Sequence, residues 1–341
     1  MSKFDYLFIT DQPSFYKVRL WNEIAKSKQV LLVFLDKKKK DRHLDFVSAK
    51  PEFNVVFSPS GFLKRMWFIA NLIIKTQYKQ LIIGGWDEPC FLLIPFISPK
   101  DKNAFLCESS IYEYRPHILK DCVKRLFLKR ISMVYLAGKA QGRLLEQLNY
   151  KGSYLYTGGC GILNYINQPE YAPRNQVDSF LYVGRLAKVK NLEVLVSVFN
   201  ELPRLKLNII GYGEEEEKLK EMSSPNIVFL GPKENKELTF YYQQADVFIL
   251  PSSYEPWGLV VEEALNNGTP VIVSDKVGCR DDLVSNNTGI VFNSGSVESL
   301  RRAIIRMTDI NFYNSLRKNI AEMNFEERRQ QQINSFIHAQ A

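Results

Sequence analysis

The sequence is poor in the residues from which most metal and redox sites are built. It contains only 3 histidines, His43, His117 and His338, and none of them has a partner at metal-ligand spacing. Its 5 cysteines include no CxxC pair, and an odd number cannot form a complete disulfide framework. We therefore expect neither a zinc site nor a complete disulfide framework. A reducing compartment, the cytoplasm, is the expected location.

Long apolar runs are also missing. Asp5 interrupts the short N-terminal apolar run, which does not fit a signal peptide. The longest apolar stretches, 66–74 and 91–97, fall well short of the ~20 residues that span a bilayer. We therefore expect neither an export signal nor a membrane-spanning helix.

Three catalytic signatures are absent as well. The chain has no GxSxG elbow, no GxxxxGK[ST] loop and no GxGxxG after a strand, so it lacks the backbone devices of serine hydrolases, P-loop enzymes and dinucleotide-binding enzymes. Gly211 and Gly213 resemble the start of such a loop. Four glutamates, 214–217, follow them and would repel a phosphate, so a structural role is predicted for these glycines.

What the chain does contain is enough apolar sequence for two domains. Its 341 residues are 45% hydrophobic, and about 150 residues is typical of one domain. Short apolar runs alternate with amphipathic stretches in both halves, which predicts parallel strands joined by helices. We therefore predict an α/β protein of two Rossmann-like, doubly wound domains, 1–165 and 166–323. A closing helix, about 324–338, can pack back on the first. The predicted strands are 6–9, 30–35, 55–57, 81–83, 104–106, 133–136, 180–183, 207–210, 227–230, 247–250, 271–273 and 290–292.

Positive charge is confined to the N-terminal half. Residues 1–165 contain 26 Lys and Arg against 14 Asp and Glu, a net charge of +12, whereas residues 166–341 contain 19 against 23, a net charge of −4. Lipid headgroups, a phosphorylated substrate and nucleic acid are the anionic candidates for this half, and a merely soluble surface is the alternative. Two predicted helices, 62–77 and 118–130, combine apolar and basic residues. Each either lies on a membrane surface or packs on its sheet with its basic side chains in solvent.

Two cations follow the first strand of the C-terminal half. Arg185 and Lys190 lie in the segment GRLAKVKN directly after residues 180–183. Open α/β sheets bind ligands at the carboxyl ends of their strands. A guanidinium fork and an ammonium group at this place suit a diphosphate. GRxxxxK alone is a weak signal, and surface charge is its alternative reading.

The most informative segment is PSSYEPWGLVVEEAL, which follows the strand 247–250. Its layout predicts a loop shaped by Pro256 and Gly258 and then a helix whose first N–H groups can face an anion. Glu255 then lies in the loop, and Glu263 lies more than a turn into the helix. The two carboxylates would therefore meet one ligand at different depths, which suits sugar hydroxyls better than an acid/base pair.

Together these segments resemble the glycosyltransferase family 4 enzymes of GT-B fold, whose E-x7-E motif matches Glu255 to Glu263. The resemblance covers essentially the whole C-terminal half, including VGRLAKVKN, FLGP, GTPVIVSD and TGIVF. It implies two Rossmann-like domains that face each other across a cleft. It also implies a retaining transfer in which the leaving phosphate assists front-face attack.

The resemblance assigns a role to each donor-site residue. Arg185 and Lys190 would bind the diphosphate of a UDP- or GDP-linked sugar, and Glu263 would bind the ribose hydroxyls. Glu255, with the backbone of Trp257, Gly258 and Leu259, would hold the donor sugar and its phosphate. Fixed cations and a helix N-terminus can stabilise the departing diphosphate without a metal, so no cofactor is expected.

The prediction of an acceptor site rests mainly on one carboxylate. Glu108 follows the strand 104–106 and is the candidate that contacts or deprotonates the acceptor hydroxyl; a loop-capping role is the alternative. Trp86, Asp87 and Glu88 follow another strand, and a lining role at the same site is expected for them.

The predicted function is glycosyl transfer to a hydroxyl of a glycan or lipid-linked saccharide, in bacterial surface polysaccharide, lipopolysaccharide or glycolipid synthesis. The expected location is cytoplasmic, with peripheral attachment to the anionic inner face of the plasma membrane as a further expectation. A non-catalytic carbohydrate-binding or partner subunit and a GT-B sugar-nucleotide epimerase remain as alternatives. Nucleic-acid binding is disfavoured.

Overall fold

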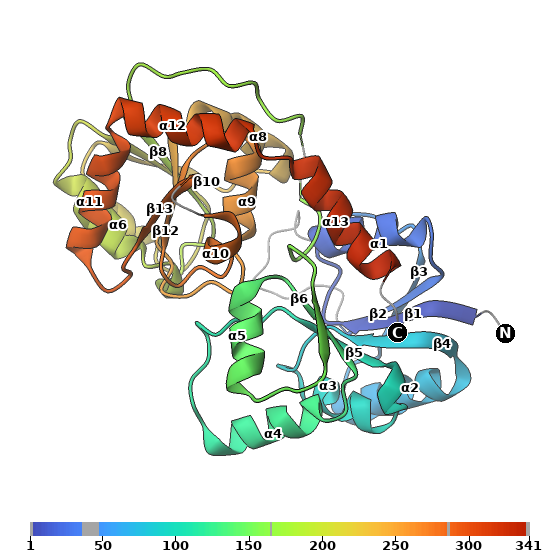
Figure 1. The fold of residues 1–341 in the computed structure, drawn as a ribbon. Coiled ribbons are helices and arrows are strands. Elements are labelled where there is room, and N and C mark those ends of the chain that lie inside the picture. The colour runs from blue at the N-terminus through green and yellow to red at the C-terminus, as the bar shows by residue number, and fades with distance from the viewer. Residues whose placement is uncertain (1–2, 36–47, 164–165, 285–286, 339–341) are drawn as a thin grey trace. The chain divides into compact units, whose positions relative to one another are not determined.

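The chain is built from two parallel β-sheets, each flanked by helices (Figure 1). The computed structural model describes residues 3–35, 48–163, 166–284 and 287–338. Contacts divide the chain into a first unit, Met1–Leu163 with Glu326–Ala341, and a second unit, Asn164–Phe325. Neighbouring strands in both sheets run parallel, which confirms the predicted α/β class. The predicted boundary after residue 165 falls at residues 164–165, which lie outside the described residues.

The described residues of the first unit form a seven-stranded sheet. Its order places β1 between β2 and β4, so the chain reverses its direction of travel across the sheet between β1 and β4. In spatial order the strands are β3 (Asn54–Phe57), β2 (Val30–Phe34), β1 (Lys3–Thr10), β4 (Gln77–Ile83), β5 (Asn103–Cys107), β6 (Met133–Leu136) and β7 (Ser153–Tyr156).

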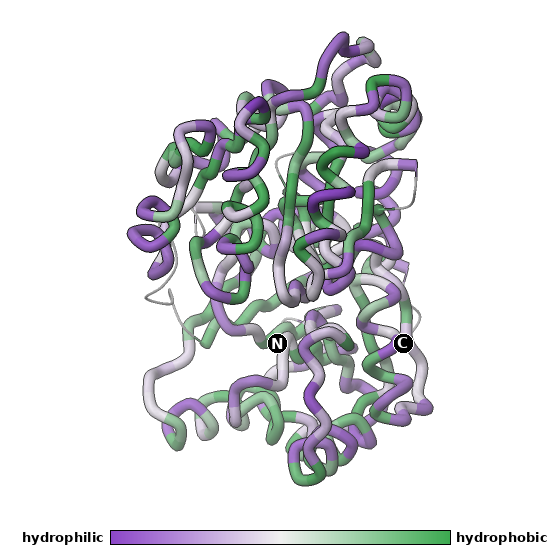
Figure 2. Tube along the Cα trace, turned by 90° about the vertical axis from the view of Figure 1, so that its left-hand side faces the viewer, coloured by the Kyte–Doolittle hydropathy of each residue, from purple (hydrophilic) through white to green (hydrophobic). Residues whose placement is uncertain are grey.

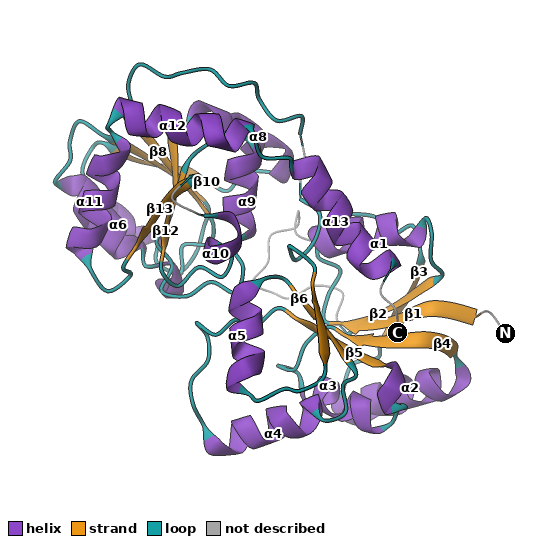
Figure 3. Ribbon diagram, in the orientation of Figure 1, coloured by secondary structure: helices purple, strands orange, loops and turns teal. Residues whose placement is uncertain are grey.

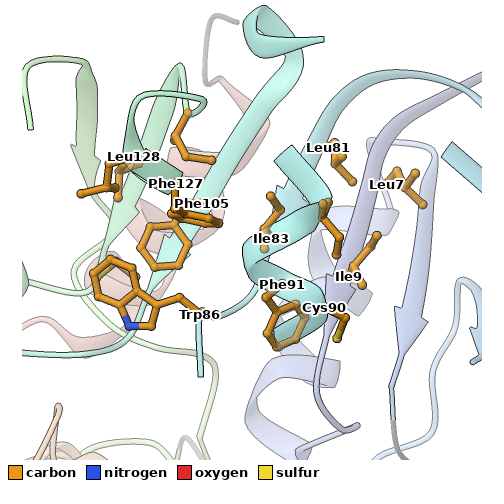
Figure 4. Close-up of a cluster of buried hydrophobic side chains, with 14 of the residues drawn as sticks. Leu7, Ile9, Leu81, Ile83, Trp86, Cys90, Phe91, Phe105, Phe127 and Leu128 are labelled. Carbon is orange, nitrogen blue, oxygen red and sulfur yellow. The ribbon is translucent and has the colours of Figure 1, made fainter. Parts of the chain in front are cut away.

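Helices cover both faces of this sheet (Figure 3). They are α1 (Phe15–Ala25), α2 (Phe62–Lys75), α3 (Pro89–Leu93), α4 (Ile118–Leu128), α5 (Lys139–Gln147) and α13 (Phe325–Ile337), with the short 3-10 helices η2 (Ile94–Phe96) and η3 (Lys100–Lys102). On one face, residues of α2, α3, α4 and α5 share a core with the strands, and Figure 4 shows Phe91, Phe105 and Phe127 in it.

The other face of the first sheet is covered by α1 and α13. The ring of Trp21, on α1, lies 4.8 Å from that of Phe8 and 5.4 Å from that of Phe336, on α13. Phe336 also stacks on Tyr135 at 4.6 Å, and the Tyr6 hydroxyl donates to its carbonyl oxygen. The closing helix therefore completes a core that includes β1, a strand more than 300 residues earlier in the chain.

The described residues of the second unit form a six-stranded sheet. Its strands, in spatial order, are β10 (Ile227–Gly231), β9 (Lys206–Ile210), β8 (Ser179–Val183), β11 (Val247–Leu250), β12 (Val271–Ser274) and β13 (Gly289–Phe292). Its helices are α6 (Leu192–Asn200), α7 (Glu216–Glu221), α8 (Asn235–Gln244), α9 (Leu259–Asn266), α10 (Arg280–Leu283), α11 (Val297–Met307) and α12 (Ile310–Ala321), with the 3-10 helix η4 (Lys188–Lys190).

Continuous apolar runs explain why the central strands were predictable. Strands such as β2 (VLLVF) and β11 (VFIL) are buried at every position, as parallel strands covered on both faces must be. Figure 2 shows such hydrophobic stretches alternating with hydrophilic ones along the chain. The prediction missed β7, whose SYLY sequence is mostly exposed. It also extended the helix 62–77 too far, because Gln77 already begins β4.

Candidate functional site

The predicted cations and the first motif glutamate flank one point in the second sheet. Strands β8 and β11 are neighbours, and the chain reverses its direction of travel between them. Arg185 follows the end of β8, Lys190 closes η4, and Glu255 lies in the loop after β11. Ligands of open α/β sheets bind at this kind of switch point, outside the carboxyl ends of the strands. The structure therefore gathers three residues that lie up to 70 positions apart in the sequence.

The Arg185 loop is supported by the glycine segment after β9. A Cβ on Gly211 would lie 1.8 Å from the Gly184 carbonyl oxygen, and one on Gly213 would lie 2.3 Å from that of Leu186. The Leu186 amide donates to the Tyr212 carbonyl at 2.9 Å. Only glycine permits such close backbone contact. These glycines have the structural role predicted for them, which is to hold the cation-bearing loop in place.

Lys190 and Glu255 form an ion pair in which both side chains are largely buried, 15% and 17% exposed. The Ser252 hydroxyl lies 3.5 Å from the same carboxylate oxygen. Beneath the pair, the Tyr182 hydroxyl donates to the Arg185 carbonyl at 2.8 Å. Burial, with a contribution from the charge of Glu255, raises the Tyr182 pKa well above its ordinary value, so this hydroxyl stays protonated. The charged side chains of Lys190 and Glu255 thus lie next to a neutral tyrosine that hydrogen-bonds to the backbone of the Arg185 loop.

The loop that holds Glu255 is fixed by a second segment, residues 276–279, which follows β12. The Glu255 amide donates to the Lys276 carbonyl, and the Gly278 amide donates to the Glu255 carbonyl, both at 2.9 Å. A Cβ on Gly278 would lie 1.8 Å from the Pro256 carbonyl oxygen. Our sequence reasoning gave this segment no role, and its one signal was a glycine shortly after a strand. It sets the position of the Glu255 backbone.

Helix α9 begins directly after this loop. Gly258 occupies its N-cap with φ +101°, a conformation that L side chains rarely adopt, and no side chain caps the helix. Trp257 is buried, and its indole N–H donates to Glu262 at 3.3 Å. The first N–H groups of an α-helix have no intrahelical partner, so the backbone at Gly258 and Leu259 can receive an anion.

Glu263 lies in the second turn of α9 and is buried. Its carboxylate accepts a hydrogen bond from the hydroxyl of Tyr242, on α8, at 3.0 Å. Burial, the charge of Glu263 and this hydrogen bond raise the Tyr242 pKa well above its ordinary value. Tyr242 therefore stays a donor and orients the carboxylate. Sequence reasoning missed it, because a tyrosine in an amphipathic helix reads as ordinary packing.

In the first unit, Glu108 belongs to a cluster of charged side chains. It follows β5, and its Oε2 atom lies 3.1 Å from the ammonium group of Lys17, on α1. Asp11, after β1, lies 3.6 Å from the same ammonium group. The Lys17 side chain is only 5% exposed. Sequence reasoning missed Lys17, since a single lysine on an amphipathic helix normally faces solvent.

The charge state of this cluster follows from its burial. Desolvation raises the pKa of Glu108, the charge of Lys17 opposes this, and Asp11 and Asp87 add to the rise. Burial alone would lower the pKa of Lys17, but the Glu108, Tyr16 and Asp11 charges outweigh it and raise that pKa. The second Glu108 oxygen, Oε1, is buried and makes no hydrogen bond to any described residue. It can therefore accept a proton.

Trp86 and His117, also in the first unit, have structural roles. Trp86 is buried in the core, 4.8 Å from the ring of Phe105, and its indole donates to Ser109 at 3.1 Å. Its indole is thus part of the core, whereas Asp87 is exposed, and the lining role of residues 86–88 stays a prediction. His117 caps α4 by accepting from the Lys120 amide. Across the described ranges, no three His, Cys, Asp or Glu side chains form a group that could hold a metal ion.

Comparison with known proteins finds a family match in the second unit and relatives over parts of the chain. Residues 166–326 match the family described as "Glycosyl transferases group 1". The sulfoquinovosyl transferase SQD2 of Arabidopsis thaliana is 38% identical over 122 residues, 35% of this chain and 24% of that protein. An "uncharacterized 41.2 kDa protein in cps region" of Klebsiella pneumoniae is 25% identical over 291 residues, 82% of this chain and 75% of that protein. The match to SQD2 thus spans about a quarter of that relative's length.

Solved structures resemble the whole chain. A sucrose-phosphate synthase from Thermosynechococcus elongatus has a TM-score of 0.77 at 20% identity and covers 96% of both chains. Anabaena HepE in complex with UDP-glucose has a TM-score of 0.70 at 14% identity and covers 98% of this chain and 99% of its own.

These likenesses confirm the predicted GT-B architecture, with two parallel-sheet, Rossmann-like domains. Within the second unit, residues 166–326 are similar to the glycosyl transferases group 1 family.

Proposed function

We propose that the protein is a retaining, family 4-like glycosyltransferase. It moves a sugar from a UDP- or GDP-linked donor to a hydroxyl of a glycan or lipid-linked saccharide, in bacterial surface polysaccharide, lipopolysaccharide or glycolipid synthesis. Cytoplasmic location with peripheral attachment to the inner membrane face is part of the proposal. Among the described residues, no helix combines the length and apolarity needed to cross a bilayer.

One observation carries the proposal: Arg185, Lys190, Glu255 and the N-terminus of α9 meet at the switch point between β8 and β11. A departing nucleoside diphosphate develops negative charge. Fixed cations and helix N–H groups at that place stabilise it without reorganisation, which makes such groups effective in catalysis. The site supplies this positive charge from its own side chains and backbone, so we propose that the transfer needs no metal.

Each residue then has a role that its contacts support. Arg185 and Lys190 bind the diphosphate, and Lys190 exchanges its ion pair with Glu255 for the ligand's phosphate. Glu255, released from Lys190, hydrogen-bonds the donor sugar, while the backbone from Trp257 to Leu259 binds its phosphate. Glu263, oriented by the Tyr242 hydroxyl, accepts hydrogen bonds from the ribose.

The acceptor is assigned to the first unit, and Glu108 is its candidate base. The raised pKa of Glu108 makes it a stronger base than a solvated carboxylate, and its Oε1 atom is the one not engaged by Lys17. Because the transfer is retaining, this base assists the incoming hydroxyl on the face from which the diphosphate leaves.

The named relatives support the substrate class. HepE was solved with UDP-glucose, and the Klebsiella relative is encoded in a cps region. Both are similar to this chain over most of its length, and group 1 glycosyltransferases are what its second unit matches.

A thermal-shift panel of nucleoside diphosphates and nucleotide sugars tests the donor site. A ligand that binds the native state raises its apparent stability, so the cognate nucleotide should raise the unfolding temperature, with or without magnesium. Arg185→Ala should abolish this shift. If no nucleotide raises the unfolding temperature, the proposal fails and a non-catalytic carbohydrate-binding or partner subunit becomes the better description.

Two glutamate variants separate binding from transfer. Glu263→Gln should weaken nucleotide binding, whereas Glu255→Gln should mainly reduce the transfer rate. Glu217→Gln, an exposed glutamate on α7, is the matched control and should change neither. A sugar-nucleotide epimerase would instead convert the donor with no acceptor present, which product analysis by NMR would reveal.

A further inference from the structure

Apolar side chains gather on the outside of three neighbouring segments of the first unit. Of the 21 large hydrophobic side chains that are exposed among the described residues, eleven lie on α2, on α3, on η2 with its C-cap residue Ile97, or on α4. Helix α3 contacts both α2 and α4, and all three lie on the same face of the sheet (Figures 1 and 3). We name this the α2–α4 surface. Its apolar members are Phe62, Leu63, Trp67, Ile74, Leu93, Phe96, Ile97, Ile118, Leu119, Val123 and Leu126.

The helices of the α2–α4 surface do not need these side chains for their packing. Ile69 and Phe127, on the opposite sides of α2 and α4, are buried in the core and hold the helices to the sheet. Leu63, Trp67 and Ile118 point away and are 79%, 71% and 83% exposed. A helix on the surface of a soluble domain normally carries polar residues on its outer side. A contiguous apolar patch of this kind marks an interaction site.

The charges on the α2–α4 surface are of one sign. The exposed charged side chains of α2 and α4 are all basic, and α2 contains no acidic residue. The one acid of α4, Asp121, is turned inward. It accepts a hydrogen bond from the Tyr114 hydroxyl at 2.6 Å, which lowers its pKa. The exposed cations are Lys64, Lys75, Lys120 and Arg125.

We propose that the α2–α4 surface docks on an anionic phospholipid bilayer. Apolar side chains mixed with lysine and arginine, without carboxylates, suit the boundary between headgroups and acyl chains. A second copy of the chain fits less well, because a two-fold interface would bring cations against cations. The inference deepens the peripheral attachment that the proposed function includes, because it names the surface that makes the attachment, and it rests on that function for its purpose, which is to reach a lipid-linked acceptor. Vesicle binding requires no donor and no transfer, so a failure of membrane docking can be told apart from a failure of the proposed glycosyl transfer.

The tryptophans provide a direct measurement. Of the 4 in the chain, Trp67 is 71% exposed, whereas Trp21, Trp86 and Trp257 are buried. Vesicles that contain phosphatidylglycerol should shift the fluorescence of the full-length protein to the blue, and lipids with brominated acyl chains should quench it. Pure phosphatidylcholine vesicles should do neither, and Trp67→Phe should lose the signal but still sediment with vesicles. Unchanged fluorescence with anionic vesicles would overturn the proposal.

Paired variants test the two parts of the surface. Lys120→Gln with Arg125→Gln should weaken partitioning into anionic vesicles roughly 25-fold, since each surface cation contributes about five-fold. Leu63→Ser with Ile118→Ser should abolish the quenching. Arg302→Gln with Ile305→Ser, at exposed positions of α11, is the matched control and should bind as the wild type does. All these positions are exposed, and thermal unfolding checks that the variants stay folded.

Two results would overturn the assignment to a membrane. The first is equal vesicle binding by the wild type and both surface variants. The second is a dimer, found by sedimentation without lipid, that Leu63→Ser with Ile118→Ser dissociates, because the surface would then serve a second copy of the chain.

Discussion

The carboxyl edges of the two sheets carry sites of different construction. In the second unit, glycines and backbone hydrogen bonds set the loops, and Arg185 and Glu255 project from a frame in which Gly278 has no room for a Cβ. In the first unit, the corresponding edge is defined by side chains, with Lys17 between Asp11 and Glu108. Loops held by backbone contacts fix the geometry with which a ligand is bound, whereas a cluster of charged side chains sets the pKa values of its members. The difference fits the proposed division, in which the second unit binds the donor and the first unit binds the acceptor.

Loss of Arg185 should have the largest effect of four changes that test this contrast. Arg185→Ala removes a fixed charge at the leaving diphosphate and should lower kcat by about 10²–10³-fold. Lys188→Ala, three residues away and exposed, is the matched control and should leave kcat unchanged. Steady-state kinetics with the cognate donor give the answer. Equal losses of kcat in both variants would show that the general positive charge of the surface, and not the position of Arg185, promotes the reaction.

The backbone frame can be tested at Gly278. Gly278→Ala forces a Cβ against the Pro256 carbonyl and should lower the free energy of unfolding by about 1–3 kcal/mol. Gly295→Ala, where the nearest atom lies 3.4 Å away, is the control and should change it by less than about 0.5 kcal/mol. Denaturant titration measures both. A tolerated Gly278→Ala would mean that the loop is not held by its backbone.

The Tyr242 hydroxyl should matter for nucleotide binding alone. Tyr242→Phe leaves the buried Glu263 carboxylate with one donor fewer, which costs about 1.4 kcal/mol and weakens nucleotide affinity about ten-fold. Isothermal titration calorimetry with the nucleoside diphosphate measures the change. Tyr241→Phe, one residue earlier and half-buried, should retain wild-type affinity. An unchanged affinity in Tyr242→Phe would remove the orienting role.

Lys17 should produce the smallest effect, a displaced pH profile. Its positive charge lowers the Glu108 pKa, so Lys17→Met should raise that pKa and move the acidic limb of kcat/KM for the acceptor to higher pH. Donor affinity should not change. Lys26→Met, at the exposed end of the same helix, is the control. A loss of donor affinity in Lys17→Met would contradict the proposed division between a donor site in the second unit and an acceptor site in the first. A pH profile that does not shift would exclude Glu108 as the base.

The same contrast, between a site held by backbone contacts and a site made of side chains, decides what could be predicted from the sequence. A site whose loops are held by backbone contacts requires glycines and prolines at fixed positions in the sequence. The order of strand, loop and helix around Glu255 could therefore be predicted, and the GT-B architecture was predicted together with it. The central strands were readable because they are buried on both faces.

Sites made by side chains leave no such spacing. Lys17 and Glu108 lie 91 positions apart, and only the register of β1 beside β4 and β5 brings their elements together. Tyr242 was hidden for a related reason, because its hydroxyl is meaningful only once α8 lies against α9. Strand β7 was not predicted because an exposed edge strand needs no continuous apolar run.

The position of α13 also bears on how the protein is made. Phe336 closes the core over Trp21 and Tyr135, yet the ribosome must synthesise the 162 residues of Asn164–Phe325 before this helix exists. At about 5–20 residues per second that takes roughly 10 to 30 s. For that interval the first sheet carries an open aromatic face on the nascent chain. The second unit, continuous in sequence, can finish folding first.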